Sequence, residues 1–182
     1  MTNDYQQFPI SDYLSCNLLK DADIQNLKSD SKILSIGVGI GLYEEYLINK
    51  LNVPPSSLYC ADLDLHKKWI GQRGFQFDIR GLWPNLNIKF DYILFGQVIG
   101  ISANNGRPVP FEVMTNHVVH IVHQAKINLK ENGKILIYDT TLPTAISDQG
   151  ADARPVFLVV AEELGGNIVR ADGFGSQVEI SF

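Results

Sequence analysis

Short apolar runs alternate with stretches of helical periodicity along most of this chain. The runs have the length and composition of buried strands and cover residues 32–36, 57–61, 75–77, 90–95 and 134–138. Helical spacing follows the first run and recurs more weakly over residues 65–72. On the first of these helices, one face carries Tyr43, Tyr46, Leu47 and Leu51. The pattern therefore predicts strands that are separated by helices.

The clearest amphipathic helix follows the fourth run. At about 100° per residue its apolar positions fall within one narrow arc, made of Phe111, Met114, Val118, Ile121, Val122, Ala125 and Leu129. A further helix is expected to begin near Asp152 and Pro155 and to end at Gly165-Gly166. Residues 96–110, which are rich in glycine, asparagine and proline, are expected to form a long loop.

The last two apolar runs, residues 168–171 and 178–182, are separated only by DGFGSQ. This connection is too short for a helical crossover, so it predicts an antiparallel hairpin. Helices between the earlier strands favour a three-layer, doubly wound α/β fold with a mostly parallel seven-stranded sheet. We expect a single domain at residues 31–182, preceded by a helical or lid segment at residues 1–30. The apolar side chains of that segment suit either a lid or ordinary packing.

Composition narrows the classes of partner. The chain has 182 residues, of which 45% are hydrophobic, and this suits one domain with a substantial core. A formal net charge of −5 and the lack of a Lys/Arg cluster argue against nucleic acid as a partner. No stretch approaches the ~20 apolar residues that span a bilayer, and the first residues are acidic where a signal peptide is basic. With only two cysteines, Cys16 and Cys60, the sequence predicts a soluble, cytoplasmic protein without a membrane partner.

Candidate chemistry gathers where the predicted strands end. Three glycines, Gly37, Gly39 and Gly41, follow the first strand and open the first helix, which lets a ligand approach the backbone closely. Other residues follow the second to fifth strands, namely Asp62, Asp78, Gly96 and Asp139. Because ligands of doubly wound sheets bind beyond the carboxyl ends of the strands, we expect these residues to border one site.

These residues, in this order and with the terminal hairpin, resemble a class I S-adenosylmethionine-dependent methyltransferase over residues 31–182. The resemblance implies that the GVGIG turn lies against the amino-acid and sulfonium part of the cofactor, and that Asp62 accepts both ribose hydroxyls. It also implies that Leu63 packs on the adenine and that Asp78, followed by Ile79, receives the adenine amino group. Gly96, at the end of the fourth strand, completes the implied cofactor-binding set.

Two positions depart from the family pattern. The acid that usually lies just before the glycine run is replaced by Ser35, so either cofactor positioning is weaker or another group makes the contact. The fourth strand ends in Gly96-Gln97-Val98-Ile99 rather than the Asn/Asp-Pro-Pro-aromatic signature of many enzymes that methylate amino nitrogens. That class of substrate is therefore disfavoured.

Alternative sites are weaker. Leu42 occupies the position that a nicotinamide-binding turn fills with a small residue, which argues against a dehydrogenase. No Cys or acid completes a metal site with His117, His120 and His123, so no bound metal is predicted.

The acceptor side is less defined. Asn104 and Arg107 are candidate substrate contacts, although a solvated Arg107 is an equal alternative. Asp139 is the candidate general base, with loop capping as its alternative. The predicted activity is methyl transfer to an unidentified small molecule, and the alternative is a non-catalytic module that binds the cofactor or a protein. The sequence predicts neither the acceptor atom nor the oligomeric state.

Overall fold

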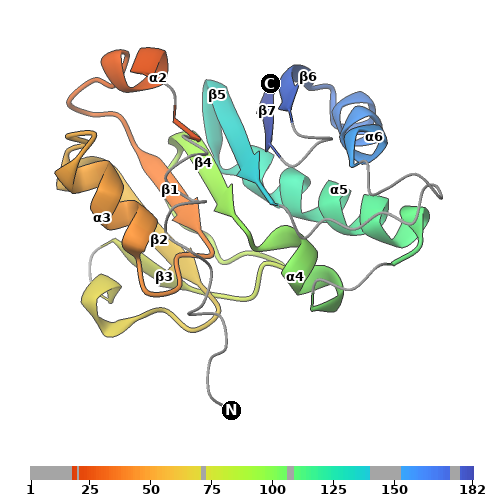
Figure 1. The fold of residues 1–182 in the computed structure, drawn as a ribbon, viewed down its shortest axis with the longest axis horizontal. Coiled ribbons are helices and arrows are strands. Elements are labelled where there is room, and N and C mark those ends of the chain that lie inside the picture. The colour runs from red at the N-terminus through yellow and green to blue at the C-terminus, as the bar shows by residue number, and fades with distance from the viewer. Residues whose placement is uncertain (1–17, 20, 71–72, 106–108, 140–152, 173–176) are drawn as a thin grey trace.

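The computed structural model describes residues 18–19, 21–70, 73–105, 109–139, 153–172 and 177–182 (Figure 1). In chain order the elements are α2 (Asp21–Gln25), β1 (Ile33–Ile36), α3 (Leu42–Asn49), β2 (Leu58–Asp62), β3 (Gly74–Gln76), β4 (Phe90–Gly96), α4 (Ile99–Asn104), α5 (Phe111–Ile127), β5 (Leu129–Tyr138), α6 (Arg154–Leu164), β6 (Asn167–Asp172) and β7 (Gln177–Ser181). Two 3-10 helices, η2 (Pro55–Ser57) and η3 (Lys67–Trp69), flank β2.

The strands form one seven-stranded sheet in the order β3-β2-β1-β4-β5-β7-β6. β1 pairs in parallel with both β2 and β4, and the parallel pairing continues to β3 on one side and β5 on the other. β7 pairs antiparallel with both β5 and β6. The predicted three-layer, mostly parallel sheet with a terminal antiparallel hairpin is confirmed.

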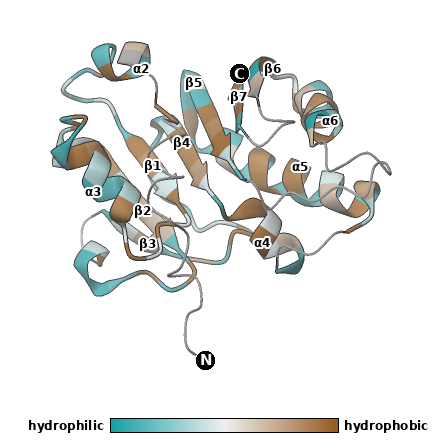
Figure 2. Ribbon diagram, in the orientation of Figure 1, coloured by the Kyte–Doolittle hydropathy of each residue, from teal (hydrophilic) through white to brown (hydrophobic). Residues whose placement is uncertain are grey.

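Alternation along β1 divides the core between the two faces of the sheet. Leu34 and Ile36 face the cluster that includes α5 and α6, whereas Ile33 faces the cluster that includes α3. The central strands β4 and β5 are largely hydrophobic, as expected for strands covered on both faces (Figure 2). Leu18 and Leu19 pack on the α3 side, where α2 also lies. Residues 1–17 of the predicted lid segment lie outside the described residues.

Three elements differ from the predicted ones. Of the helix expected at residues 65–72, the described residues form only η3, and the Trp69 carbonyl oxygen lies so close to Gly74 that a β carbon there would be 1.9 Å from it. The predicted loop at residues 96–110 contains α4, whose six residues are too few for a periodic pattern. β5 begins at Leu129 instead of Lys134, since Leu129 pairs with Phe90 across a register shift.

Candidate functional site

The parallel register brings the predicted site residues to one edge of the sheet. Ile36, the last residue of β1, lies beside Ala61 and Phe95. The next residue along each of these three chain segments is therefore also at the sheet edge, and these residues are neighbours: Gly37 after β1, Asp62 at the end of β2 and Gly96 at the end of β4. Asp139 follows β5 at the same edge, because Gly96 pairs with Tyr138.

The three glycines of the turn have positive φ angles of 80°, 53° and 81° at Gly37, Gly39 and Gly41. A β carbon on Gly37 would lie 2.7 Å from the Val98 β carbon, and one on Gly41 would lie 2.5 Å from the Trp69 indole nitrogen. At Gly39, a β carbon would meet no atom of the described part of the chain within 4 Å. Two of the glycines thus permit close packing of the protein on itself, whereas Gly39 faces open space.

Asp62 joins the end of β2 to this turn. Its Oδ2 accepts a hydrogen bond of 2.8 Å from the Gly39 backbone N–H, and its Oδ1 accepts one of 3.2 Å from the Asp64 N–H. The carboxylate is half-buried and has about four lone-pair sites, so it retains acceptor capacity toward a ligand. Asp62 therefore fixes the glycine turn and is available to a ligand beside it.

Apolar side chains border the turn. Leu63 is 60% exposed, and Ile40 and Leu42 are 39% and 38% exposed. Each lies next to a residue of the candidate site, on the glycine turn or directly after Asp62. They offer apolar surface to the flat face of a ligand ring.

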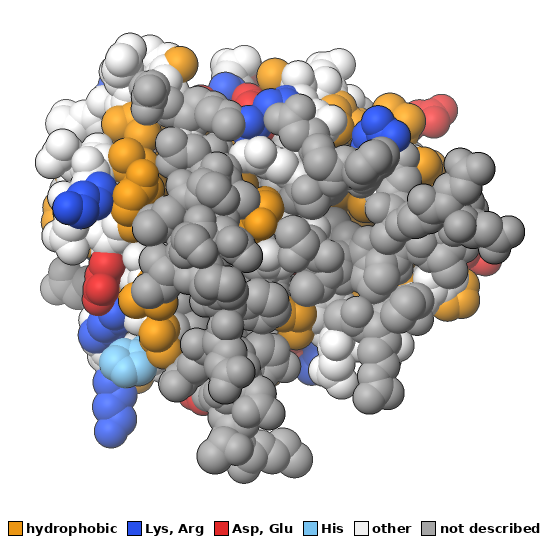
Figure 3. All heavy atoms as spheres, in the orientation of Figure 1, with side chains coloured by type: hydrophobic (Ala, Val, Ile, Leu, Met, Phe, Trp, Pro, Cys, Tyr) orange, Lys and Arg blue, Asp and Glu red, His pale blue; other side chains and the backbone are white. Residues whose placement is uncertain are grey.

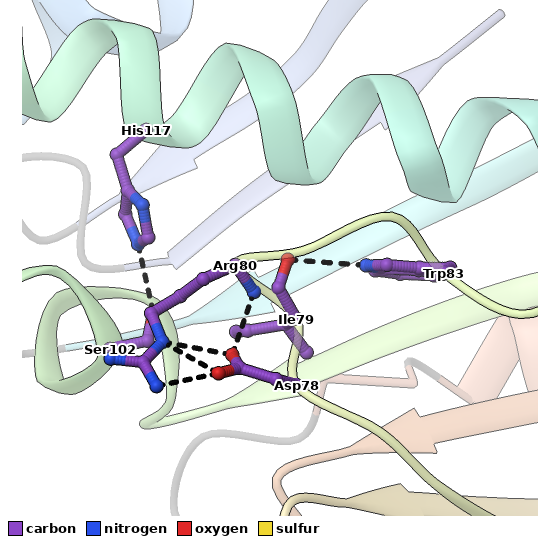
Figure 4. Close-up of polar contacts among 6 residues, drawn as sticks. All are labelled: Asp78, Ile79, Arg80, Trp83, Ser102 and His117. Atoms are coloured by element: carbon purple, nitrogen blue, oxygen red, sulfur yellow. Dashed lines mark hydrogen bonds and ion pairs between the residues drawn. The ribbon is translucent and has the colours of Figure 1, made fainter.

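Asp78 forms an ion pair with Arg80, which folds back over it (Figure 4). The Arg80 Nη2 donates to Asp78 Oδ2 at 2.5 Å, and the Arg80 backbone N–H donates to Oδ1 at 2.9 Å. These bonds to Arg80 lower the pKa of Asp78 below its ordinary value. Ile79 is buried, and its carbonyl accepts from the Trp83 indole at 3.2 Å, which holds the loop that carries Asp78.

α4 is fastened at two points, to the sheet edge through Asp139 and to α5 through His117. The Asp139 carboxylate, only 1% exposed, accepts a 2.9 Å hydrogen bond from the Gly100 N–H at the start of α4. His117 of α5 lies 2.8 Å from Ser102 Oγ of α4 (Figure 4). Burial lowers the pKa of His117, which favours its neutral form. The position of Asp139 agrees with the capping alternative for this residue.

The structure does not bring the remaining candidate residues together in one site. Asn104 is exposed at the end of α4, and Arg107 lies outside the described residues. His120 contacts the Gly81 carbonyl at 3.0 Å rather than the other histidines. Within the described part of the chain, no group of three or more His, Cys, Asp or Glu side chains is placed to hold a metal ion.

Glu44 is a site residue that the sequence did not reveal. It lies in the first turn of α3 and is 2% exposed. Its Oε1 accepts a 2.6 Å hydrogen bond from Ser35 Oγ. Ser35 is the residue that occupies the position where the family pattern has an acid. Burial raises the pKa of Glu44 to about 7. The signal that points to it is Ser35 itself, a hydroxyl in a fully buried strand that needs a polar partner.

Basic side chains of the described residues do not form one patch on the face of the molecule that Figure 3 shows. The Lys and Arg side chains of that face lie in small separate groups. Two surface hollows, one lined in part by Lys28 and Lys130 and the other by Ile48 and Arg73, do not include the glycine turn. Among the described residues, no helix has the length and apolar character needed to cross a bilayer.

No family model and no curated protein sequence matches the chain. Solved structures do match its fold. A S-adenosylmethionine-dependent methyltransferase from Clostridium acetobutylicum superposes with a TM-score of 0.57 at 13% identity, over 94% of this chain and 90% of that one. The fold is that of a class I methyltransferase.

Other proteins with the class I methyltransferase fold match as well. PigF bound to SAH matches with a TM-score of 0.56 at 14% identity, over 94% of this chain and 56% of PigF. An O-methyltransferase family protein from Burkholderia thailandensis gives 0.53 at 12% identity, over 87% of this chain and 53% of that one. The chain thus spans only about half the length of these two proteins. It likewise spans 49% of the plantazolicin methyltransferase BpumL and 44% of the sugar N-methyltransferase KedS8.

Proposed function

We propose that this protein binds S-adenosyl-L-methionine at the glycine turn and transfers its methyl group to a small-molecule acceptor. The observation that carries the proposal is the contrast among the three glycines. Gly37 and Gly41 are required for packing against Val98 and Trp69, whereas Gly39 has the same left-handed conformation and no neighbour on its open side among the described residues. A turn that leaves backbone uncovered at a sheet edge is suited to direct contact with a ligand.

The surrounding residues fit this cofactor. Asp62 is a carboxylate at the end of β2 with spare acceptor sites for two ribose hydroxyls, and Leu63 offers an exposed apolar side chain for the adenine. Asp78 is the proposed acceptor for the adenine amino group, with Arg80 as a competitor for its oxygens. Gly96, the last residue of β4, and the buried Ile79, which follows Asp78, complete the proposed cofactor-binding set.

When bound, S-adenosyl-L-methionine supplies a methyl group whose leaving group, the sulfonium sulfur, is already activated. The protein therefore chiefly has to align the acceptor with the methyl group and exclude water. In the proposal α4 provides the acceptor side, because Asp139 fastens it to the sheet edge and His117 fastens it to α5. Asn104 and Arg107 remain candidate acceptor contacts. The net charge of −5 and the scattered basic side chains support a small molecule over nucleic acid.

Calorimetric titration with S-adenosylmethionine and with its demethylated product tests the proposal. Asp62→Ala removes two charge-assisted acceptors and is expected to weaken binding at least tenfold. Asp64→Ala is the matched control, because its side chain is exposed and only its backbone N–H contacts Asp62. If the wild type binds neither compound, or if both variants bind equally well, the proposal is wrong.

A second function is a cofactor-binding module without turnover. It is favoured by the burial of Asp139, the predicted base, whose carboxylate is engaged by the Gly100 N–H. Tight binding of the demethylated product, with no transfer from labelled cofactor to any of a broad panel of hydroxyl, amine, thiol and carboxylate acceptors, would support this function. Transfer to any member of the panel would exclude it.

A further inference from the structure

A buried carboxyl group links the two ends of the glycine turn, because Glu44 follows the turn on α3 and its side chain is bonded to Ser35, which precedes the turn on β1. Glu44 is in the first turn of α3, three residues after Gly41, and its side chain packs against β1. Oε1 accepts from Ser35 Oγ, whereas Oε2 is buried and has no hydrogen-bond partner among the described residues. A half-satisfied carboxyl is costly to bury, and the cost is far larger when the group is ionised.

The charges around Glu44 do not neutralise it directly. Lys68 of η3 attracts its negative charge, but the Lys68 ammonium is bound to the neighbouring Glu45 at 2.5 Å. Asp62 at the end of β2 opposes the charge. The Cys60 thiol on β2 also interacts with Glu44, and burial raises the pKa of Cys60, so this group stays neutral.

Tyr43 completes the polar surroundings on α3 itself. Burial raises the pKa of its hydroxyl, which therefore remains protonated. Burial likewise places the pKa of Glu44 at about 7, so the protonated and ionised forms are both populated near neutrality. A change of charge at the glycine turn is then enough to shift the balance between the two forms.

We propose that Glu44 is a positioning residue that senses the charge of the bound ligand: it releases its proton when a positively charged sulfonium occupies the turn, and regains one when a neutral thioether does. The proton passes to and from solvent, and no covalent bond other than the carboxyl O–H changes. The inference rests on the proposed function. It adds that the turn discriminates between substrate and product forms of the same cofactor by charge.

The physical basis is the low polarity around Glu44. A positive charge near a carboxyl that water does not screen favours the ionised form. The sulfonium and thioether forms share their adenosine and amino-acid parts and differ by one methyl group and one charge, so a difference in proton release between them reports on that charge. If the sulfonium makes Glu44 ten times more acidic, its affinity relative to the thioether rises roughly sevenfold between pH 5.5 and 8.5.

The experiment is calorimetry at pH 7 in phosphate and in imidazole, two buffers whose heats of ionisation differ widely. The difference in observed heat gives the number of protons released. For S-adenosylmethionine we expect the wild type to release roughly 0.4 proton if Glu44 becomes ten times more acidic, and clearly less for the demethylated product. Glu44→Gln should release none from this site, while Glu163→Gln, at an exposed position of α6 on the other face of the sheet, should behave as the wild type.

The outcomes distinguish this inference from the proposed function. If neither ligand binds, both are wrong. If both ligands bind with equal proton release, or if Glu44→Gln retains the wild-type difference, only the charge-sensing role is overturned. A second measurement does not depend on the fold of a variant: carbon NMR of the Glu44 carboxyl in the wild type should show a lower pKa with the sulfonium form than with the thioether form. An unchanged pKa would also overturn the inference.

Discussion

Alanine at Gly39 is expected to separate ligand binding from folding, whereas alanine at Gly37 or Gly41 should disturb folding itself. All three positions have positive φ, which costs an alanine roughly 1–2 kcal/mol. At Gly39 this is the whole expected cost, because the added β carbon meets none of the described atoms within 4 Å. We therefore expect Gly39→Ala to lower the free energy of unfolding by about 1 kcal/mol.

The other two substitutions add a steric cost. A β carbon at Gly37 would approach the Val98 β carbon to 2.7 Å, and one at Gly41 would approach the Trp69 indole nitrogen to 2.5 Å. Neither neighbour is the far end of a flexible chain, so the backbone or a packed ring must move. Overpacking of this kind costs about 1–3 kcal/mol, which brings the expected loss at each position to roughly 2–5 kcal/mol.

Urea unfolding of the three variants gives the stability order, and calorimetry with S-adenosylmethionine gives the binding order. Gly39→Ala should remain folded and lose at least tenfold in affinity, because its methyl group enters the space assigned to the cofactor. Two results would refute this reasoning. One is a loss of stability at Gly39 as large as at Gly37 and Gly41, and the other is a folded Gly39→Ala protein with wild-type affinity.

Three further predictions concern ionisable groups. The raised pKa of Glu44 means that the folded state holds this proton more tightly than the unfolded state, so its stabilisation is present at low pH and is lost as pH rises through about 7. In urea titrations Glu44→Gln should gain about 2 kcal/mol relative to the wild type between pH 5.5 and 8.5, and parallel curves would contradict this. Arg80→Ala should lower the free energy of unfolding by less than about 1 kcal/mol at pH 7, since the pair is exposed. That small loss should shrink as pH falls below the ordinary aspartate range and vanish below the lowered pKa of Asp78, because Arg80 stabilises only the ionised carboxylate. A loss that is as large at pH 3 as at pH 7 argues against the ion pair. Asp139→Ala leaves the buried Gly100 N–H without this acceptor and should lower the free energy of unfolding by about 1–3 kcal/mol. Asp139→Asn keeps an acceptor oxygen and should lose less. Equal stability of Asp139→Ala and the wild type in urea unfolding would show that the capping bond is unimportant.

The parts of the fold that the sequence predicts are mainly those in which hydrophobic residues recur at a regular spacing. α5 presents Met114, Val118 and Ile121 at helical spacing, and all three are fully buried. The hairpin was predictable because its short connection excludes a crossover helix. α4 was not, since its six residues include Gly100 and Asn104 and it is held by long-range contacts with Asp139 and His117 instead of its own periodicity.

The candidate site likewise contains residues that were predictable from the sequence and residues that were not. The glycine turn and Asp62 follow from their positions after strands, because parallel register alone makes them neighbours. Glu44 was hidden because a charged residue in a helix is normally solvated, and its burial depends on the approach of α3 to Ser35. Arg80 was also missed, since its contact with Asp78 depends on the conformation of an irregular loop.

The position of β7 has a consequence for the order in which the chain assembles. β7 follows every other strand in sequence, yet it lies between β5 and β6 and supplies a hydrogen-bonded partner to each. During synthesis β1 to β5 can pair as a parallel unit, but β6 has no neighbour until residues 177–181 emerge from the ribosome. Until these residues have emerged, β5 is an open edge with unpaired backbone groups, and the nascent chain is exposed to misplaced strand pairing.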